Sequence, residues 1–520
     1  MIESSGILIR GILFDVLGVV TAIVAVGYAL VYWRYSYWKN KGVPYFQPTF
    51  PFGSLINPYF SSKPVSFGDG ITQLYKKAKS RGYRHLGIYF MLRPTYMVVD
   101  LELVKHIMTK DFQYFVDRGM YTNEKDDPMS AHLFAVGGKK WRSLRTKLTP
   151  TFTSGKMRAM LQTLVDCGLV LENYVEECTK TKESIDIKDV LGCFSTDIIG
   201  SCAFGLECNS FQDPNSAFRE NGKKIFQPSG SRLISFIKFL LMQNHKLART
   251  LKLRQIKKSV SDFFTKVVTD TVEYREKNNY VRNDFLQLLI NSRDKNEGNN
   301  SGAADNNLLT MNEIVAQSFV FFIAGFETSS TTMTFALFEL ALHPQIQDRL
   351  REEISTVLKK HQGQITYDSL NELKYMNQVI DETLRKYAPL SFITRECVED
   401  YKVPGEDVVV EKGTRVVIPV RGIHYDEEYY TDPKKFDPDR FTEENKRNRH
   451  QYAHIPFGEG PRICIGQRFG IMQSKVGLTC ILRKFKVTLD EQKTPLPLQM
   501  NPRAFITTSQ GGIWLNLEKL

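Results

Sequence analysis

The chain has 520 residues and a hydrophobic content of 42%, which allows a sizeable core in one large domain or in two or three average ones. Its 69 Lys and Arg residues against 57 Asp and Glu residues give a formal charge of +12, which favours an anionic partner. No zinc-finger, RNA-binding or homeodomain pattern occurs, so an acidic protein or a membrane surface fits better than nucleic acid, and eight cysteines without paired spacing indicate a reducing compartment.

The first predicted element is a membrane helix. Val16 to Trp33 is uncharged, apolar and about as long as a transmembrane helix needs to be. A cleaved secretory signal fits less well because no small-residue cleavage site follows, and a mitochondrial presequence would be amphipathic and rich in arginine and serine. Arg34, Lys39 and Lys41 follow the run, so residues 1–41 are expected to form a single-pass anchor with the rest of the chain in the cytosol. Its exit is crowded by residues typical of an interfacial aromatic belt: Tyr28, Tyr32, Trp33, Tyr35, Tyr37 and Trp38.

Three irregular or β-rich segments come next. Residues 42–58 contain four prolines among aromatic residues, which predicts a semi-rigid linker to a domain at 59–520. Two β-rich runs between Tyr83 and Val99 flank Arg93-Pro94-Thr95, which predicts a small hairpin around these three residues. Asp117 to Lys139 is polar and interrupted by glycines and a proline, so we expect a long surface loop, a kind of segment that is often functional.

A helical region begins at Lys139. Trp141 and Arg145 are four residues apart and therefore share a helix face, where an indole N–H and a guanidinium could together bind a carboxylate. The alternative is a half-buried tryptophan beside an arginine that reaches to solvent. Several amphipathic helices are expected up to Lys277. Within them Leu233 to Met242 is apolar enough for the core or for membrane contact, and Asn291 to Asn307 is a low-complexity linker.

A long apolar helix is predicted from a capping box at Thr310 and Glu313 up to His343, where Pro344 follows. In its middle the Thr328 hydroxyl is spaced to bond the Ala324 carbonyl. One interpretation is an ordinary packing notch. The other is an opened turn in which Thr328 and Glu327 hold water and deliver protons.

The next motif is Glu382-x-x-Arg385, on a helix expected over Asn371 to Tyr387. The spacing alone is weak, because it recurs at Glu444 and at Glu459, and such pairs are usually solvated. This copy is followed by Phe436 to Phe441, which contains Arg440, and then by a cysteine loop.

The cysteine loop runs from Pro456 to Gly466, and its glycines and prolines forbid a regular helix or strand. It presents Cys464 without a second cysteine nearby, and no CxxC occurs in the chain, so zinc and iron–sulfur sites fit poorly. A haem needs only one such axial ligand. The small residues would let a flat ring approach, Phe457 could pack beside the sulfur, and following N–H groups could donate to it. The alternative is a turn before a buried structural cysteine.

The whole loop resembles the haem loop of the cytochrome P-450 superfamily. Ala324 to Ser329 is similar to the oxygen-activation motif of that superfamily, and the resemblance covers nearly the whole chain. The loop with its extension Gln467 to Gly470, together with Phe321 to Thr328, looks most like insect microsomal members that oxidise plant toxins and insecticides. The resemblance implies a mainly α fold: a single large helical haem-thiolate domain with small β-sheets, preceded by an N-terminal transmembrane helix.

The resemblance also implies roles for the motif residues. Cys464 would be the axial ligand of the iron of haem b, Thr328 and Glu327 would deliver protons, and Trp141 and Arg145 would bind a haem propionate. Further implied propionate ligands are Arg395, Arg462 and Arg118. Glu382, Arg385 and Arg440 would form a buried structural network behind the haem.

The implied function is a membrane-bound monooxygenase of the endoplasmic reticulum that inserts one oxygen atom from O2 into a lipophilic substrate such as a xenobiotic, a plant toxin or an insecticide. No dinucleotide or flavin fingerprint is visible, so electrons would come from NADPH through a separate flavoprotein reductase, with a b-type cytochrome as a second electron partner. Two alternatives remain: a haem-thiolate isomerase or dehydratase, against which the Glu327-Thr328 pair argues, and a non-catalytic haem sensor or carrier.

Overall fold

The computed structural model describes residues 2–55, 65–226, 232–293 and 308–520. Pro58 of the predicted linker and the predicted low-complexity segment beyond Arg293 lie outside these ranges.

The described residues are mainly helical, which confirms the predicted fold class. The α-helices are α1 (Ile2–Tyr35), α2 (Tyr37–Asn40), α3 (Phe67–Lys79), α4 (Leu101–Lys105), α5 (Gly138–Leu148), α6 (Ser154–Thr181), α7 (Ile187–Ile199), α8 (Ala217–Phe226), α9 (Arg232–Met242), α10 (His245–Thr250), α11 (Lys258–Lys277), α12 (Phe285–Ile290), α13 (Met311–Leu342), α14 (Pro344–Lys360), α15 (Tyr367–Glu372), α16 (Lys374–Lys386), α17 (Val420–His424), α18 (Glu443–Asn448) and α19 (Gln467–Leu482). Short 3-10 or π turns are η1 (His106–Lys110), η2 (Phe112–Phe115), η3 (Pro128–Ser130), η4 (Thr149–Phe152), η5 (Gly200–Phe204), η6 (Pro438–Phe441), η7 (Gln451–Ala453) and η8 (Gly460–Arg462).

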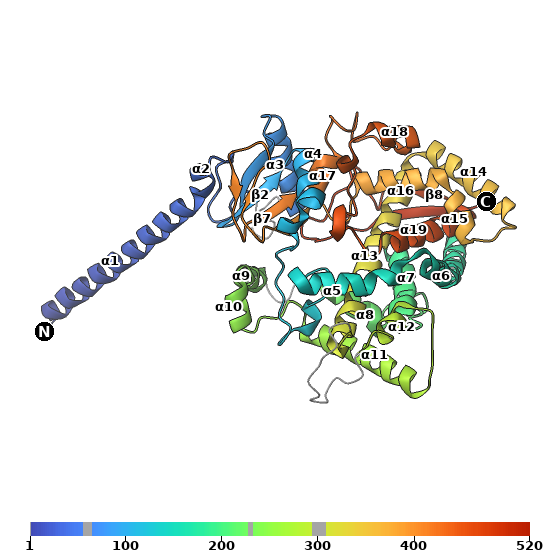
Figure 1. Ribbon diagram of the computed structural model, residues 1–520, viewed down its shortest axis with the longest axis horizontal. Coiled ribbons are helices and arrows are strands. Elements are labelled where there is room, and N and C mark those ends of the chain that lie inside the picture. The colour runs from blue at the N-terminus through green and yellow to red at the C-terminus, as the bar shows by residue number, and fades with distance from the viewer. Residues whose placement is uncertain (1, 56–64, 227–231, 294–307) are drawn as a thin grey trace.

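The strands form small sheets at the edges of the helical body. The largest has the order β1-β2-β7-β4, with β2 and β7 parallel, and Figure 1 shows it at the end of the domain that carries α1. Two further sheets have the orders β3-β9-β8 and β5-β6. The strands are β1 (His85–Phe90), β2 (Arg93–Val98), β3 (Ile185–Asp186), β4 (Ile393–Glu396), β5 (Tyr401–Lys402), β6 (Val409–Val410), β7 (Arg415–Ile418), β8 (Phe485–Leu489) and β9 (Trp514–Lys519).

The predicted hairpin exists, but its predicted turn is wrong. The turn is formed by Met91 and Leu92, with Met91 at a φ of 56°, and Arg93-Pro94-Thr95 begins strand β2. Pairing of β2 with β7 starts only at Thr95. Pro94 therefore precedes the part of β2 that has a strand on both sides, a position where the missing N–H of proline is tolerated.

Asp117 to Lys139 is irregular as predicted, but the prediction of a surface loop is wrong. Most of its residues from Asp127 to Val136 are buried, although Glu124 and Lys125 are exposed, and Asp127 accepts hydrogen bonds from the N–H groups of Gln255 and Ile256 at 2.7 and 3.1 Å. The N–H of Leu133 donates to Gln317 of α13 at 2.8 Å. Because these partners replace water, the segment can form an inner wall of the protein rather than its surface.

Helix α13 crosses the centre of the core and is buried over most of its length. Both predicted capping-box bonds are present: the Glu313 N–H donates to the Thr310 hydroxyl at 3.2 Å, and the Thr310 N–H donates to the Glu313 carboxylate at 3.1 Å. The helix ends at Leu342, with His343 as its cap before Pro344. Helices α6, α7, α11 and α19 surround it in the same hydrophobic core.

At the other end of the chain, α1 projects away from the domain (Figure 1), and its residues Phe14–Tyr35 are apolar and long enough to cross a membrane by length and composition. Tyr28, Tyr32 and Trp33 are exposed, in keeping with an interfacial belt. Trp38 does not belong to such a belt, because it is buried and its indole N–H donates to the carbonyl of Ile88 in β1 at 3.0 Å. A side chain at Gly87 would come within 2.3 Å of this indole, so the glycine makes room for it. The N-terminal segment after α1 therefore joins the sheet at a packed contact.

Candidate active site

The loop that precedes α19 presents Cys464. Gly458 and Gly460 both have φ values of 74°, a conformation that glycine adopts at little cost. A Cβ atom on Gly460 would lie 2.0 Å from the backbone oxygen of Met108, so the loop also packs too closely there for any other residue. The Cys464 N–H donates to the carbonyl of Phe457 at 2.9 Å and closes the loop.

The Cys464 side chain is exposed to space that protein atoms do not fill, although the residue lies deep inside the protein. Burial raises the pKa of its thiol, while the Gly466 N–H and then the positive charges of Arg118 and Arg145 act in the opposite direction. The expected N–H donation after Cys464 therefore comes from Gly466. A thiol that borders unfilled interior space is placed to bind a group that enters that space.

The Thr328 turn of α13 also faces open space. Ala324 is exposed and Thr328 half-buried, although most of the helix is buried. The Thr328 hydroxyl donates to the Ala324 carbonyl at 2.5 Å, which confirms the predicted bond. Gly325 has a further role that the sequence did not reveal, because a Cβ atom there would lie 2.3 Å from the side chain of Ile199 in α7.

Helix α19, which starts directly after the cysteine loop, packs against α13. A Cβ atom on Gly470 would be 3.5 Å from the Ser329 hydroxyl, and the ring of Phe285 lies 5.4 Å from Phe469 and 5.6 Å from Phe321. The loop with Cys464 and the turn with Thr328 are therefore carried by neighbouring elements.

Glu327 points to a partner that the sequence did not suggest. Its carboxylate accepts a hydrogen bond at 2.8 Å from the Nζ atom of Lys188, at the start of α7, and both side chains are mostly buried. The pair joins residues that are 139 positions apart, so no local pattern could have indicated it. The structure brings Glu327 to α7, while the hydroxyl of Thr328 bonds within its own helix.

The predicted propionate ligands form a cluster of positive charge made up of Arg118, Arg145, Arg395 and Arg462. Burial, followed by the charges of Arg118 and Arg145, lowers the pKa of Arg462 to about 9. Burial lowers the pKa of Arg118 to about 10, and burial with repulsion from Arg118 and Arg462 holds the pKa of Arg395 well below its ordinary value. Each of these side chains therefore lies close to at least one other guanidinium.

No residue in the described ranges supplies this arginine cluster with a carboxylate within 4.0 Å. The buried Nε atoms of Arg118, Arg395 and Arg462 have no hydrogen-bond partner within those ranges either. Buried charges without partners are costly, so the cluster is built for an anionic ligand.

Aromatic rings and backbone carbonyls hold the arginine cluster in place. The Arg462 guanidinium lies 4.3 Å from the centre of the Trp141 ring and donates to the carbonyl of Val136 at 2.6 Å. Arg145 donates to the carbonyl of Ile463 at 2.9 Å, and Arg118 lies 3.8 Å from the centre of the Phe134 ring. Trp141 is thus a platform for Arg462, while Arg145 fastens α5 to the cysteine loop.

Sequence reasoning missed His132, which lies within the buried segment before α5. Its Nδ1 atom has no partner among the described residues, and burial, followed by the charge of Arg118, lowers its pKa to about 4. A single histidine in an irregular segment carries no sequence signal that separates it from a surface residue.

The residues of the Glu-x-x-Arg motif lie together in the interior. Glu382 and Arg385 are fully buried, and Arg385 binds the carboxylate with its Nε and Nη2 atoms at 2.6 and 2.8 Å. Arg385 also donates to the carbonyl of His424 at 2.9 Å, and the Nε of Arg440 lies 3.5 Å from Glu382. The Asp437 N–H donates to Glu382 at 3.0 Å, so the network connects α16 to the segment ahead of the cysteine loop.

The residues present fit a haem. An open thiol, a helix turn that faces unfilled space and a cluster of unpaired arginines would match an iron atom, a flat ring and two propionates.

Comparisons with known proteins agree with this geometry. A family model described as Cytochrome P450 matches residues 52–516. The chain is 42% identical over 512 residues to probable cytochrome P450 6a14 of Drosophila melanogaster, which covers 97% of this chain and 99% of that protein. It is 43% identical over 497 residues to cytochrome P450 6A1 of Musca domestica, with 94% of this chain and 95% of that protein covered. The chain belongs to the cytochrome P450 family, whose members are haem-thiolate monooxygenases.

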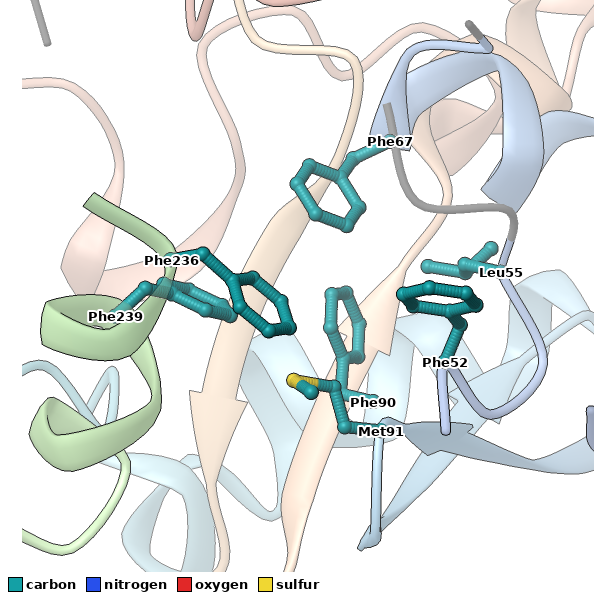
Figure 2. Close-up of a pocket in the computed structure, with 7 residues that line it drawn as sticks. All are labelled: Phe52, Leu55, Phe67, Phe90, Met91, Phe236 and Phe239. Atoms are coloured by element: carbon teal, nitrogen blue, oxygen red, sulfur yellow. The ribbon is translucent and has the colours of Figure 1, made fainter. Parts of the chain in front are cut away.

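An apolar pocket of about 60 Å³, lined by none of these site residues, lies between the segment before α3, the β1–β2 turn and α9. Figure 2 shows the side chains that line it: Phe52, Leu55, Phe67, Phe90, Met91, Phe236 and Phe239. Because sites for drug-sized ligands occupy roughly 300–1,000 Å³, this pocket is too small to hold such a substrate. It is the place where α9 meets the N-terminal part of the domain.

Proposed function

We propose that this protein inserts one oxygen atom from O2 into a lipophilic substrate, such as a xenobiotic, a plant toxin or an insecticide. Electrons come from NADPH through a separate flavoprotein reductase, with a b-type cytochrome as a second donor. The observation that carries the proposal is the open Cys464 thiol, which shares the interior with the Thr328 turn and the unpaired arginine cluster. The formal charge of +12 suits docking of acidic electron-transfer partners.

In this proposal Cys464 would hold the haem iron through its sulfur, and the bound haem would supply an iron centre that activates oxygen. Arg118, Arg145, Arg395 and Arg462 would hold the propionates. The Trp141 ring supports Arg462, and the unpartnered Nδ1 of His132 adds a further candidate ligand for a propionate. Phe457 holds the cysteine loop closed through its carbonyl, and its partly buried ring packs against the core.

Thr328 and Glu327 have the proton-handling roles. The Thr328 hydroxyl donates its one hydrogen bond to the Ala324 carbonyl, which leaves its oxygen lone pairs free to accept a hydrogen bond from a water molecule at this turn. Glu327 is mostly buried beside Lys188 and lies next to this turn, so it can exchange protons between the interior and the partly exposed lysine. Both residues act on water and protons, and neither is required to hold the haem.

Thr328→Ala tests the proposed function. We expect this variant to consume NADPH while forming less product and more hydrogen peroxide, because general acid–base assistance typically contributes about 10²–10⁴-fold and its loss need not stop electron flow. The measurement is product and peroxide per NADPH in haem-loaded enzyme with reductase, using an alkoxycoumarin whose dealkylation gives a fluorescent product.

Thr334→Ala is the matched control, because its hydroxyl makes the same type of bond on the same helix, to Ser330 at 2.7 Å, but is fully buried. It should lower thermal stability and leave product per NADPH unchanged. Unchanged coupling in Thr328→Ala would contradict proton handling by this residue. Product formation without NADPH and reductase would instead indicate a peroxide isomerase or dehydratase, and no product with any substrate would indicate a sensor.

The membrane arrangement is a further part of the proposal. Helix α1 supplies an anchor in the endoplasmic reticulum, and Figure 1 shows α9 at the end of the domain from which α1 projects. Several apolar side chains of α9 are exposed, among them Ile234, Ile237 and Leu240. Lipid contact by α9 would cover them, so we propose that the face of the domain beside the anchor rests on the cytosolic leaflet.

Protease added to intact microsomes is expected to digest the catalytic domain, because the positive charges of Arg34, Lys39 and Lys41 favour a cytosolic position for it. Immunoblotting of the domain with and without detergent makes the measurement, with a lumenal protein as the control for intact vesicles. Digestion only after detergent is added would place the domain in the lumen and refute this topology.

A further inference from the structure

Lys188 binds two separate parts of the protein beside the proposed proton path. Its Nζ atom donates to Glu327 of α13 at 2.8 Å and also to the hydroxyl of Thr508 in the C-terminal segment. The Lys188 side chain is 24% exposed and that of Glu327 is 15% exposed. An ion pair this sheltered is screened less than a surface pair, so it can fix the position of the carboxylate.

The backbone around Lys188 is itself well fixed. Asp186 caps α7 by accepting the Lys188 N–H at 3.1 Å, and the same carboxylate accepts the N–H of Ile513 at 3.3 Å, just before β9. The neighbouring Asp189 binds Arg219 of α8 at 2.5 Å, and Arg219 is almost fully buried. The first turn of α7 is thus fastened to β9 and to α8, and Lys188 projects from a rigid base.

The second partner of Lys188 leads toward the segment between α16 and β4. Thr507, next to Thr508, donates its hydroxyl to the carbonyl of Ala388 at 2.7 Å and its N–H to the carbonyl of Pro389 at 3.0 Å. These residues directly precede Leu390 to Ile393. The adjacent residues Thr507 and Thr508 therefore link the segment between α16 and β4 to Lys188, which in turn binds Glu327.

We propose that Lys188 is a positioning residue for Glu327. It holds the carboxylate at one place between the Thr328 turn and the C-terminal segment, so that protons reach the turn by one defined route. Without the ammonium, the flexible glutamate side chain would lose its fixed position, and a proton donor must lie within about 2.6–3.2 Å of its acceptor to work. This inference rests on the proposed role of Glu327 in proton handling.

The competing explanation is that the Lys188–Glu327 pair only fastens α7 to α13. In that case its loss would lower the unfolding temperature and leave catalytic coupling unchanged. The two explanations predict different ratios of peroxide formed to NADPH consumed. A change in stability alone would not alter this ratio.

The experiment compares Lys188→Met, Lys188→Arg, Glu327→Gln and the double variant Lys188→Met with Glu327→Gln, each as full-length haem-loaded enzyme. Unfolding temperatures of the four variants and the wild type measure whether the pair forms in solution, independently of turnover. Peroxide and product per NADPH are then measured with reductase and the alkoxycoumarin. Asp189→Asn is the matched control, because it breaks the adjacent pair with Arg219 and leaves Lys188 in place.

We expect Lys188→Met to raise the peroxide formed per NADPH by roughly threefold or more. This effect is small compared with the loss of a complete general acid–base contribution, because Glu327 remains present. The affinity for the alkoxycoumarin should be unchanged. Lys188→Arg should restore most of the coupling, and the double variant should be no worse than Glu327→Gln. Asp189→Asn should lower the unfolding temperature and keep the coupling of the wild type.

Two outcomes distinguish failure of the positioning role of Lys188 from failure of the proposed role of Glu327. Wild-type coupling in Lys188→Met, together with uncoupling in Glu327→Gln, would overturn the positioning role alone. Wild-type coupling in Glu327→Gln would overturn the proposed role of Glu327, and the inference about Lys188 with it.

Discussion

Arg385→Ala is expected to leave almost no haem-loaded protein. The substitution removes the two hydrogen bonds of 2.6 and 2.8 Å that neutralise Glu382, and both residues are fully buried. Breaking a buried pair by removing one partner typically costs about 3–5 kcal/mol. Because whole domains are stable by only about 5–15 kcal/mol, the loss is large enough to prevent accumulation of the folded protein.

The remaining partners cannot compensate. The Nε atom of Arg440 is 3.5 Å from Glu382, and the Asp437 N–H is a single donor at 3.0 Å. Arg385→Ala also removes the bond to the carbonyl of His424, which holds α16 against α17. Thermal unfolding followed by circular dichroism, and the yield of haem-loaded protein, make the measurement.

The chain offers a matched control for Arg385. Glu444 and Arg447 have the same spacing but are exposed on α18, and no ion pair joins them among the described residues. Arg447→Ala should change stability by no more than about 0.5 kcal/mol, as is usual for surface substitutions. A well-folded Arg385→Ala enzyme with normal haem content and altered catalysis alone would contradict the structural role of Arg385.

Cys464→Ala is expected to abolish product formation. Cys464 is the cysteine whose side chain is open to interior space, within reach of the charges of Arg118 and Arg145, and under the proposed function it would provide the thiolate on which haem-thiolate chemistry depends. Haem held through the arginine cluster would then lack its sulfur ligand. The measurement is alkoxycoumarin turnover with NADPH and reductase, normalised to haem content.

Cys480→Ala is the control for this prediction. Cys480 lies on the same helix that follows the loop, but it is fully buried, and burial raises the pKa of its thiol to about 12. A buried thiol of this kind is inert, so its removal should lower stability slightly and keep turnover. Full turnover by Cys464→Ala would show that another group performs the chemistry.

Sequence reasoning worked where one local pattern determines the geometry. The bond from Thr328 to Ala324 follows from the four-residue spacing of a helix, and the capping box at Thr310 needs only residues three positions apart. The cysteine loop was recognisable because its glycines and prolines exclude regular structure and because its sequence resembles a family motif, and the structure has positive φ angles at Gly458 and Gly460. Each of these features depends on neighbours in the chain, and tertiary packing did not change it.

Sequence reasoning failed where a distant segment of the chain supplies the contact that fixes a residue. Trp38 was assigned to a membrane interface because aromatic composition cannot show that β1 leaves room at Gly87. The segment before α5 was placed on the surface because it is polar. Its polar groups are instead satisfied inside the protein by Gln255, Ile256 and Gln317, which lie far along the chain. The lysine that pairs with Glu327 was missed for the same reason.

The arginine cluster lies between these cases. Arg395 and Arg462 were assigned through family resemblance, and local spacing gave only the shared face of Trp141 and Arg145. The physical reason for the cluster appears only in three dimensions, where buried guanidiniums repel one another and lack carboxylate partners in the described structure. An anionic ligand would neutralise their buried positive charge.

The measurement that tests ligation by Cys464 most directly is the absorption spectrum of the reduced protein under carbon monoxide. The wild-type protein should show the red-shifted band of a thiolate-ligated haem, and Cys480→Ala should keep it. Cys464→Ala should lose this band while still binding haem. A Cys464→Ala protein that retains the red-shifted band would contradict the assignment of Cys464 as the axial ligand.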